Sequence, residues 1–399
     1  MKRNRRSTFG TPLVTALMLI IMIASSRLRA DTGTCGGATA TLPFTDVMGN
    51  LFFCQIAEAY FSGLTNGTTA TTYSPGDNVT RGQMAAFITR TLDQSLKRGS
   101  RRAASDQFWT PPSADGLRFT SVGLTPQLDK SDGADLWVPN FVSGSVSRVR
   151  ASDGKLLETW TGATYAISVL SAKGLIFVTS ETDPGMLYQI DPTQPAGTVS
   201  TLTSALGPVP DSISFDGARI WTANNGGSVS IVTLNPLSVT TVTAGFTQLA
   251  GILYDGVNMW VTDFAANKLF KLDSNGAIIQ TVTVGSLPAF PVFDGTNIWV
   301  PNANALIQED SVTVVRASTG AVVATLHQNG SSGLNAAAFD GERVLVTNQN
   351  SSNVSLWKAA NLSPLGNVSV GSGAVPFGVC SDGLNFWITL NGTGQLARF

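Results

Sequence analysis

Side chains able to support nucleophilic, acid–base or metal chemistry are few in this chain of 399 residues. His327 is the single histidine, and the only cysteines are Cys35, Cys54 and Cys380. No Gly-x-Ser-x-Gly segment is present to carry a hydrolase nucleophile. Glycine runs such as 371–373 are not followed by a helical pattern, so they indicate turns rather than phosphate loops. The sequence therefore predicts no catalytic residue, no metal site and no cofactor.

The cysteines have two different predicted roles. Cys35 and Cys54 flank the start of a small N-terminal segment, and an oxidising compartment would allow them to form a disulfide. Cys380 lies in an apolar stretch without a nearby cysteine or histidine, which predicts a buried thiol.

The first thirty residues have the pattern of an export signal. Basic residues between Lys2 and Arg6 precede a short apolar run from Leu13 to Ser26, and Ala30 is the expected cleavage point. The alternative is an uncleaved membrane anchor, but the run is shorter than the roughly 20 residues that a spanning helix needs. We predict an exported protein, located in the periplasm, at the cell surface or in the medium, with no membrane span after cleavage.

Removal of this segment would leave 19 basic and 26 acidic residues. A mildly acidic exported protein is a poor candidate for binding nucleic acid, because the phosphate backbone attracts basic surfaces. Nucleic acid is therefore not predicted as a partner.

The chain beyond about residue 117 repeats one pattern seven times. In five repeats an Asp-Gly pair is followed, three and four residues after the glycine, by an apolar residue and a Trp, as in Asp216-Gly217 with Ile220-Trp221. One repeat has Leu345 in place of the Trp, and a weaker copy has Lys173-Gly174 with Ile176-Phe177. The period of about 39 to 46 residues is that of a four-stranded propeller blade. In the fifth repeat the expected strands are 289–293, 298–301, 311–316 and 321–326, and the recurrent Trp is expected to fill the space between blades.

This pattern resembles the YVTN and NHL class of seven-bladed β-propellers. The final repeat supplies three strands, so residues 120–123 are predicted to complete it as the fourth strand. Asn or Asp recurs eight residues after the turn aspartate, at Asn140, Asn224, Asp263, Asn302 and Asn348. These side chains are interpreted as stabilising the turn that leaves the second strand, the alternative being a polar ring for a ligand.

The resemblance implies that the residues entering the first strands converge at the mouth of the central channel. They are Gln127, Ile167, Asp211, Ala250, Ala289, Asn335 and Phe377. Only Asp211 is ionisable, whereas acid–base catalysis needs several convergent titratable groups. The set favours a recognition surface, with Gln127, Asp211, Asn335 and Phe377 as contacts. His327 is predicted to lie at the rim instead.

The segment before the repeats is predicted to contain two short helices. One spans 52–61, and the second opens at Thr80 with Gln83 as its capping-box partner and Met84, Phe87, Ile88 and Leu92 as a buried stripe. Phe44-Thr45-Asp46-Val47, Gly63 to Thr68, and Tyr73 to Gln83 follow in the order of an S-layer homology repeat, which this segment resembles up to Leu96. The resemblance implies binding to cell-wall polysaccharide through Thr80, Arg81 and Gln83. A purely structural cap or assembly role is the alternative.

Together these features predict an all-β fold, a seven-bladed β-propeller with a small helical N-terminal domain. The expected boundaries are a signal peptide over 1–30, an S-layer-homology-like domain over 31–97, a linker over 98–116 and the propeller over 117–399. Two functions remain open. One is an exported, envelope-associated binding or scaffold protein whose propeller face recruits a protein or glycan. The other is a propeller enzyme of the lactonase or lyase type, whose acidic residues would come from loops.

Overall fold

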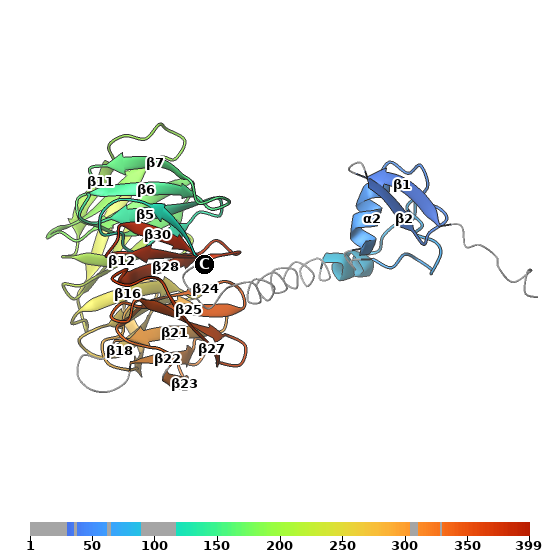
Figure 1. Cartoon of the computed structure of the whole chain (residues 1–399). Helices are drawn as coiled ribbons and strands as arrows, with labels where there is room; N and C mark the ends of the chain where they lie inside the picture. Colours follow the sequence, from blue (N-terminus) through green and yellow to red (C-terminus); the bar gives the residue numbers. More distant parts are fainter. Residues whose placement is uncertain (1–29, 36–37, 62–64, 89–116, 304–309, 328) are drawn as a thin grey trace, which may run out of the picture. The chain divides into compact units, whose positions relative to one another are not determined.

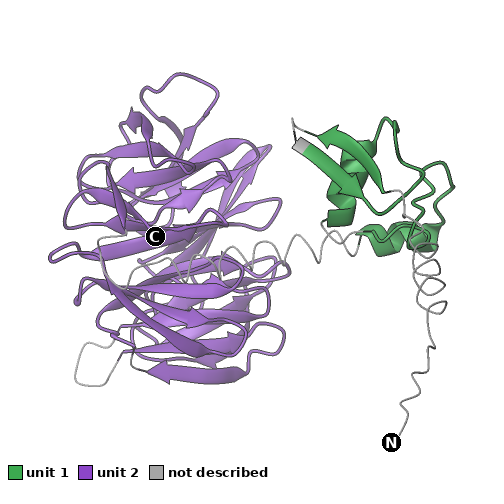
Figure 2. Ribbon diagram, turned by 45° about the vertical axis from the view of Figure 1, so that its right-hand side comes forward, with its two compact units in different colours: residues 1–98 green, residues 99–399 purple. Residues whose placement is uncertain are grey.

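The computed structural model describes residues 30–35, 38–61, 65–88, 117–303, 310–327 and 329–399. The chain divides into two compact units, residues 1–98 and 99–399, which Figure 2 shows in different colours. The predicted signal peptide, apart from Ala30, and the predicted linker over 98–116 lie outside the described residues. Within the described part, no helix is long and apolar enough to cross a membrane.

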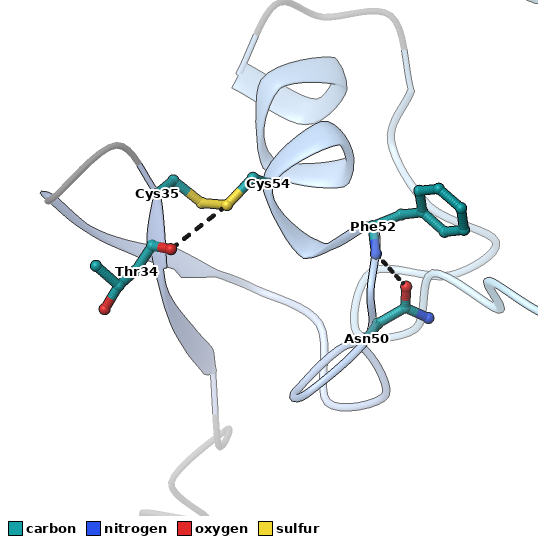
Figure 3. Close-up of a disulfide and its surroundings, with 5 residues drawn as sticks. All are labelled: Thr34, Cys35, Asn50, Phe52 and Cys54. Atoms are coloured by element: carbon teal, nitrogen blue, oxygen red, sulfur yellow. Dashed lines mark hydrogen bonds between the residues drawn. A yellow bond between two sulfur atoms is a disulfide. The ribbon is translucent and has the colours of Figure 1, made fainter.

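The first unit is built on a hairpin and a short helix. Strands β1 (Asp31–Cys35) and β2 (Ala38–Leu42) pair antiparallel, and α2 (Phe53–Phe61) buries Phe53 and Ile56 against them. Cys35 in β1 and Cys54 in α2 are joined by a disulfide, shown in Figure 3. The bond ties the hairpin to the helix that covers it. The helix predicted over 52–61 is confirmed, beginning one residue later.

Residues 81–88 form a second helix with the predicted start. The Gln83 N–H donates to the Thr80 hydroxyl at 3.2 Å, and the Thr80 N–H donates to Gln83 Oε1 at 2.8 Å. This confirms the capping box. The predicted buried stripe is wrong for Met84 and Ile88, which are 50% and 63% exposed. The core of this unit is filled by side chains between Leu42 and Tyr73, which pack on one another and leave these two outside.

The second unit is a ring of seven four-stranded antiparallel sheets, so the seven-bladed propeller is confirmed (Figure 1). Each blade runs from an innermost first strand to an outermost fourth strand, except that blade 7 takes its fourth strand from the start of the unit. Blades 1 to 3 comprise β4 (Lys130–Ser131), β5 (Asp135–Asn140), β6 (Ser145–Arg150), β7 (Leu156–Thr161); β8 (Ala166–Ala172), β9 (Leu175–Ser180), β10 (Gly185–Ile190), β11 (Ser200–Leu206); and β12 (Pro210–Phe215), β13 (Ile220–Asn224), β14 (Ser228–Leu234), β15 (Leu237–Val242).

Blades 4 and 5 comprise β16 (Leu249–Tyr254), β17 (Met259–Asp263), β18 (Lys268–Leu272), β19 (Ile278–Thr283); and β20 (Val292–Phe293), β21 (Asn297–Asn302), β22 (Ser311–Arg316), β23 (Val322–His327). Blades 6 and 7 comprise β24 (Leu334–Phe339), β25 (Arg343–Asn348), β26 (Asn353–Lys358), β27 (Ser363–Ser369); and β28 (Pro376–Ser381), β29 (Phe386–Leu390), β30 (Gln395–Arg398), β3 (Arg118–Ser121). The first strand of blade 5 is shorter than predicted because Pro291 has no N–H to donate.

The ring closes in blade 7 as predicted. Strand β3 pairs antiparallel with β30, with Thr120 opposite Leu396, and becomes the outer strand of that sheet. The Thr120 hydroxyl donates to the Gly154 carbonyl of blade 1 at 2.5 Å. In Figure 1 the red strand β30 lies beside the green strand β5, and Leu396 and Leu136 of these strands belong to one buried apolar cluster. The two ends of the propeller thus stabilise each other.

The repeated Asp-Gly and Trp positions form one hydrogen-bonded unit. In blade 3, Asp216 Oδ1 accepts the N–H groups of residues 218 and 219, while its Oδ2 accepts the indole N–H of Trp221 at 2.7 Å. Gly217 adopts a left-handed φ of 94°, which favours glycine. The same 2.7 Å indole bond recurs in blades 1, 4, 5 and 7. Each of these Trp side chains is fully buried, which confirms the predicted packing role.

Blade 6 replaces this unit with an ion pair. Arg343 is 2% exposed and donates through Nε to Asp340 Oδ2 at 2.7 Å, while Leu345 stands where five blades have Trp and blade 2 has Phe177. The guanidinium lies 5.3 Å from the Phe386 ring of blade 7. A buried charge is therefore compensated by a carboxylate and an aromatic face.

The recurrent Asn and Asp side chains after the second strands are buried structural groups. Asn224 donates to the hydroxyls of Ser228 and Ser230 at 3.0 and 2.9 Å, and the Asp263 carboxylate accepts the N–H groups of Thr247 and Ala266. They have a structural role, but the predicted bonding to the residue's own turn is found only in part, as at Ala266. The partners are mostly serine and threonine of the third strand and the loop from the preceding blade, rather than the residue's own turn.

Candidate functional site

The candidate site lies at the end of the propeller where the first strands begin, which we call the mouth. The first strands of neighbouring blades contact one another, so they surround the central axis. Each begins opposite the end of its second strand, with Pro210 opposite Asn224 and Pro376 opposite Leu390. The same register recurs around the ring. The residue that follows this pair in each first strand belongs to the inner ring: Gln127, Ile167, Asp211, Ala250, Ala289, Asn335 and Phe377.

A second ring of side chains was not identified from the sequence. In all seven blades the residue after the second strand donates its N–H to the carbonyl of the residue before the first strand, at 2.7 to 3.2 Å. We call these residues the upper ring: Phe141, Glu181, Asn225, Phe264, Ala303, Gln349 and Asn391. The signal in the sequence was their position, directly after the recurrent Asn or Asp in five blades and after Ser180 and Leu390 in the other two. The mouth therefore consists of two rings.

The repeated hydrogen bond holds an unusual backbone conformation. Thr125, Tyr165, Val209, Leu287 and Val375, which accept it, have left-handed φ values of 50° to 57°. Such values are uncommon for any residue other than glycine, and least favourable for the β-branched Thr125, Val209 and Val375, so they persist only where the surroundings enforce them. Accordingly, the chain turns sharply into each first strand and places the two rings side by side.

The two rings bring a second carboxyl group to Asp211, which corrects the prediction of one ionisable group at the mouth. Glu181 of blade 2 is hydrogen-bonded to Asp211 of blade 3. Burial and then the neighbouring Glu181 raise the pKa of Asp211 to about 8, while burial raises the pKa of Glu181. Two adjacent carboxyl groups cannot both ionise readily, so the pair retains a proton at neutral pH.

Amide side chains extend this pair across a third blade. Asn225 Nδ2 donates to Asp211 Oδ2 at 3.0 Å and lies 3.4 Å from the carbonyl oxygen of Leu249. Gln248 Nε2 of blade 4 in turn donates to Asn225 Oδ1 at 3.1 Å. Glu181, Asp211, Asn225 and Gln248 therefore form one line of hydrogen-bonded side chains over blades 2 to 4, which we call the polar line.

The other inner-ring residues selected from the sequence lie in blades 1, 6 and 7. Gln127 is buried, and its side-chain oxygen has no donor among the described residues. Asn335 donates to the carbonyl of Phe377 at 3.0 Å. The Phe377 ring is half-buried and lies 6.0 Å from that of Phe290. The mouth thus combines the polar line with a pair of aromatic rings.

Two other sets of residues lie outside the two rings. His327 ends the outer strand β23 and is exposed, which confirms the predicted rim position. In the first unit, the side chains of Thr80 and Gln83 form the capping box, and Arg81 is exposed. Among the described residues, no three His, Cys, Asp or Glu side chains gather as metal ligands.

Comparison with known proteins identifies the small unit and the propeller separately. Residues 55–85 match the S-layer homology domain. Comparison with curated protein sequences gives no significant match. Among solved structures, hydrazine synthase of Kuenenia stuttgartiensis is similar with a TM-score of 0.60 and 14% identity over 70% of this chain and 97% of that chain.

A streptogramin B lyase has a TM-score of 0.56 and 14% identity over 71% of this chain and 97% of its own. The WD40 propeller domain of Doa1 has a TM-score of 0.55 and 14% identity over 70% and 97%. At this identity the similarity concerns the propeller fold alone. The S-layer homology match points to association with the cell surface.

Proposed function

We propose that the protein is an exported binding protein of the cell envelope. Its S-layer homology domain attaches to cell-wall polysaccharide, and the mouth of its propeller recruits a protein or glycan. The observation that carries the second part is the polar line over blades 2 to 4, at the same mouth as a half-buried aromatic pair. Fixed hydrogen-bonding groups beside apolar surface orient a bound partner.

Attachment is tested at Arg81. Because the side chains of Thr80 and Gln83 serve the capping box, the exposed Arg81 guanidinium is the group left to bind the polymer. We expect Arg81→Ala to lower co-sedimentation with purified wall material severalfold while the circular dichroism spectrum stays unchanged. Lys155→Ala, which removes one positive charge from the propeller, is the control. Equal sedimentation of both variants and the wild type would remove the wall-binding role.

Recruitment is tested by the double variant Asp211→Ala/Phe377→Ala. Loss of a central polar contact and an aromatic anchor is expected to weaken capture of a ligand from envelope extracts at least tenfold, since such groups dominate interfaces. The variant Asp191→Ala/Leu237→Ala changes a half-buried carboxylate and an exposed apolar side chain elsewhere on the propeller and serves as the control. Undiminished capture by the mouth variant would exclude the mouth as the recognition surface.

The Glu181–Asp211 pair also favours a second candidate function, acid–base catalysis. A carboxyl group that keeps its proton at neutral pH can act as a general acid beside an ionised partner. Turnover of a lactone that disappears in Asp211→Ala would assign the protein to the enzyme class. Turnover that persists in that variant, or none at all, leaves recognition as the function of the mouth.

A further inference from the structure

The polar line has more hydrogen-bond acceptors than donors. The Asn225 and Gln248 amides already donate to Asp211 and Asn225, respectively. One shared proton between Glu181 and Asp211 leaves the remaining carboxyl oxygens as acceptors. A ligand that completes this network must therefore supply donors.

Gln127 provides an independent sign of a missing donor. Its side chain is 6% exposed, and its Oε1 atom is buried without a partner among the described residues. Gln127 has the same strand register as Asp211, since Pro126 lies opposite Asn140 as Pro210 lies opposite Asn224. Its side chain thus belongs to the same inner ring. A buried carbonyl oxygen without a donor is costly unless a water or ligand supplies one.

The charge of the mouth face also favours a ligand that supplies hydrogen-bond donors. This face comprises the starts of the first and third strands, the ends of the second and fourth strands and the loops between them. Within the described residues, Lys268 is its single Lys or Arg side chain, and its acidic residues are Glu181, Asp183, Asp211, Asp263 and Asp310. The resulting negative potential attracts cations and disfavours anionic polymers.

From this excess of acceptors and negative charge, we infer that the mouth binds an ammonium or guanidinium group, placed between the Glu181–Asp211 pair and Gln127. The inference rests on the proposed recognition function and specifies the partner as a protein that inserts a Lys or Arg side chain. Such a group supplies positive charge and several N–H donors at once. The Phe290 and Phe377 rings of the same mouth offer apolar surface to the carbon chain of such a side chain.

Binding of the cation is expected to release a proton from the mouth. The bound cation replaces the proton that Glu181 and Asp211 share, so affinity is expected to rise with pH until the pair is ionised, near pH 8. The other titratable groups nearby are Asp183 on the same loop and Tyr165 before β8; Asp263 of blade 4 has its carboxylate occupied by backbone N–H groups. The pair is therefore expected to be the source of the released proton.

The test uses the mature full-length protein and three uncharged-backbone probes: Nα-acetyl-arginine amide, Nα-acetyl-lysine amide and Nα-acetyl-citrulline amide. Citrulline has the shape of arginine without its charge. By calorimetry or NMR up to about 20 mM probe, which nearly saturates a site with a Kd of about 1 mM, we expect the cationic probes to bind and citrulline to fail. Affinity should rise up to about tenfold per pH unit between about pH 6 and pH 8, with proton release. Competition by spermidine tests whether a free polyamine, rather than a protein side chain, supplies the ammonium group.

Glu181→Gln is expected to weaken binding at least tenfold and to abolish its pH dependence, whereas Asp183→Asn, with the same charge change on the same loop, should bind as the wild type. Equal binding of citrulline, binding of calcium ions in place of the probes, or no binding of either cation contradicts the inference. If the double variant Asp211→Ala/Phe377→Ala still captures less ligand from envelope extracts than the wild type, the recognition function is retained and only the cation inference fails. If the probes do not bind and the double variant captures as much ligand as the wild type, the recognition function is excluded as well.

Discussion

Deletion of residues 117–124 should lower the melting temperature by roughly 10 °C or more, because it opens the ring at the seam between blades 7 and 1. The deletion removes β3, whose pairing with β30 gives the last blade its fourth strand. It also removes the Thr120 bond to Gly154 and the apolar contacts of Leu117 and Val122. The outer edge of β30 would then present unpaired backbone groups to solvent.

A length-matched control deletes eight residues from 98–116 and keeps β3. Thermal unfolding followed by circular dichroism and by tryptophan fluorescence separates the two cases. The control should melt as the wild type does, and the β3 deletion should melt early and expose apolar surface. An unchanged melting temperature after deletion of 117–124 would mean that the ring closes by other contacts.

Asp129→Asn is expected to stabilise the protein at neutral and higher pH, because the same seam contains a buried carboxyl group. Asp129 of blade 1 accepts the thiol proton of Cys380 of blade 7 at 3.1 Å, and both residues are buried. Burial raises the pKa of Asp129 from 3.8 to about 7. The ionised carboxylate of Asp129 therefore has a higher free energy in the folded state than in the unfolded state.

The sign follows from proton binding. Between pH 3.8 and about 7 the folded protein binds this proton more tightly than the unfolded chain, so the free energy of unfolding falls as pH rises through this window. Between about pH 5 and pH 8 the contribution of Asp129 to the free energy of unfolding falls by on the order of 3 kcal/mol. Asp129→Asn removes that loss, so urea unfolding should show a flatter pH dependence in the variant.

Asp153→Asn is the matched control for charge. Hydrogen bonds from Lys155 and attraction by Arg150 lower the pKa of exposed Asp153, so it does not titrate between about pH 5 and pH 8. The remaining pH dependence in Asp129→Asn should come from the Glu181–Asp211 pair and have the same sign. Parallel pH profiles for Asp129→Asn and the wild type would show that Asp129 is ionised in the folded protein at a normal pKa.

The first unit shows where helical periodicity is insufficient. The capping box was predictable because Thr80 and Gln83 interact over three residues, a distance that local helical geometry determines. The exposure of Met84 and Ile88 was not predictable, because the helical spacing of apolar residues does not show which other element packs on them. Whether an apolar face is covered depends on which other elements pack against it.

The amino-acid sequence by itself determined the number of blades, their strands and the closure of the ring. The Asp-Gly turn and the Trp five residues after the aspartate are local enough to reveal five blades, since one carboxylate binds both the turn and the indole. The other two blades were recognised from weaker copies of the repeat, which have Phe177 and Leu345 in the Trp position. The inner ring was equally predictable, because it has a constant place in the repeat. The sequence shows that blade 6 departs from this pattern, but it does not show that Arg343 and Asp340 form a buried ion pair there.

Only the tertiary structure decided which side chains meet at the mouth. Glu181 and Asp211 are thirty residues apart, in different blades, and neither belongs to a local motif that would connect them. Asp129 and Cys380 meet across the closing seam although 251 positions separate them. Burial raises the pKa of both Asp129 and Asp211, and the neighbouring Glu181 raises that of Asp211 further. Both effects depend on the closed ring rather than on residue type or spacing.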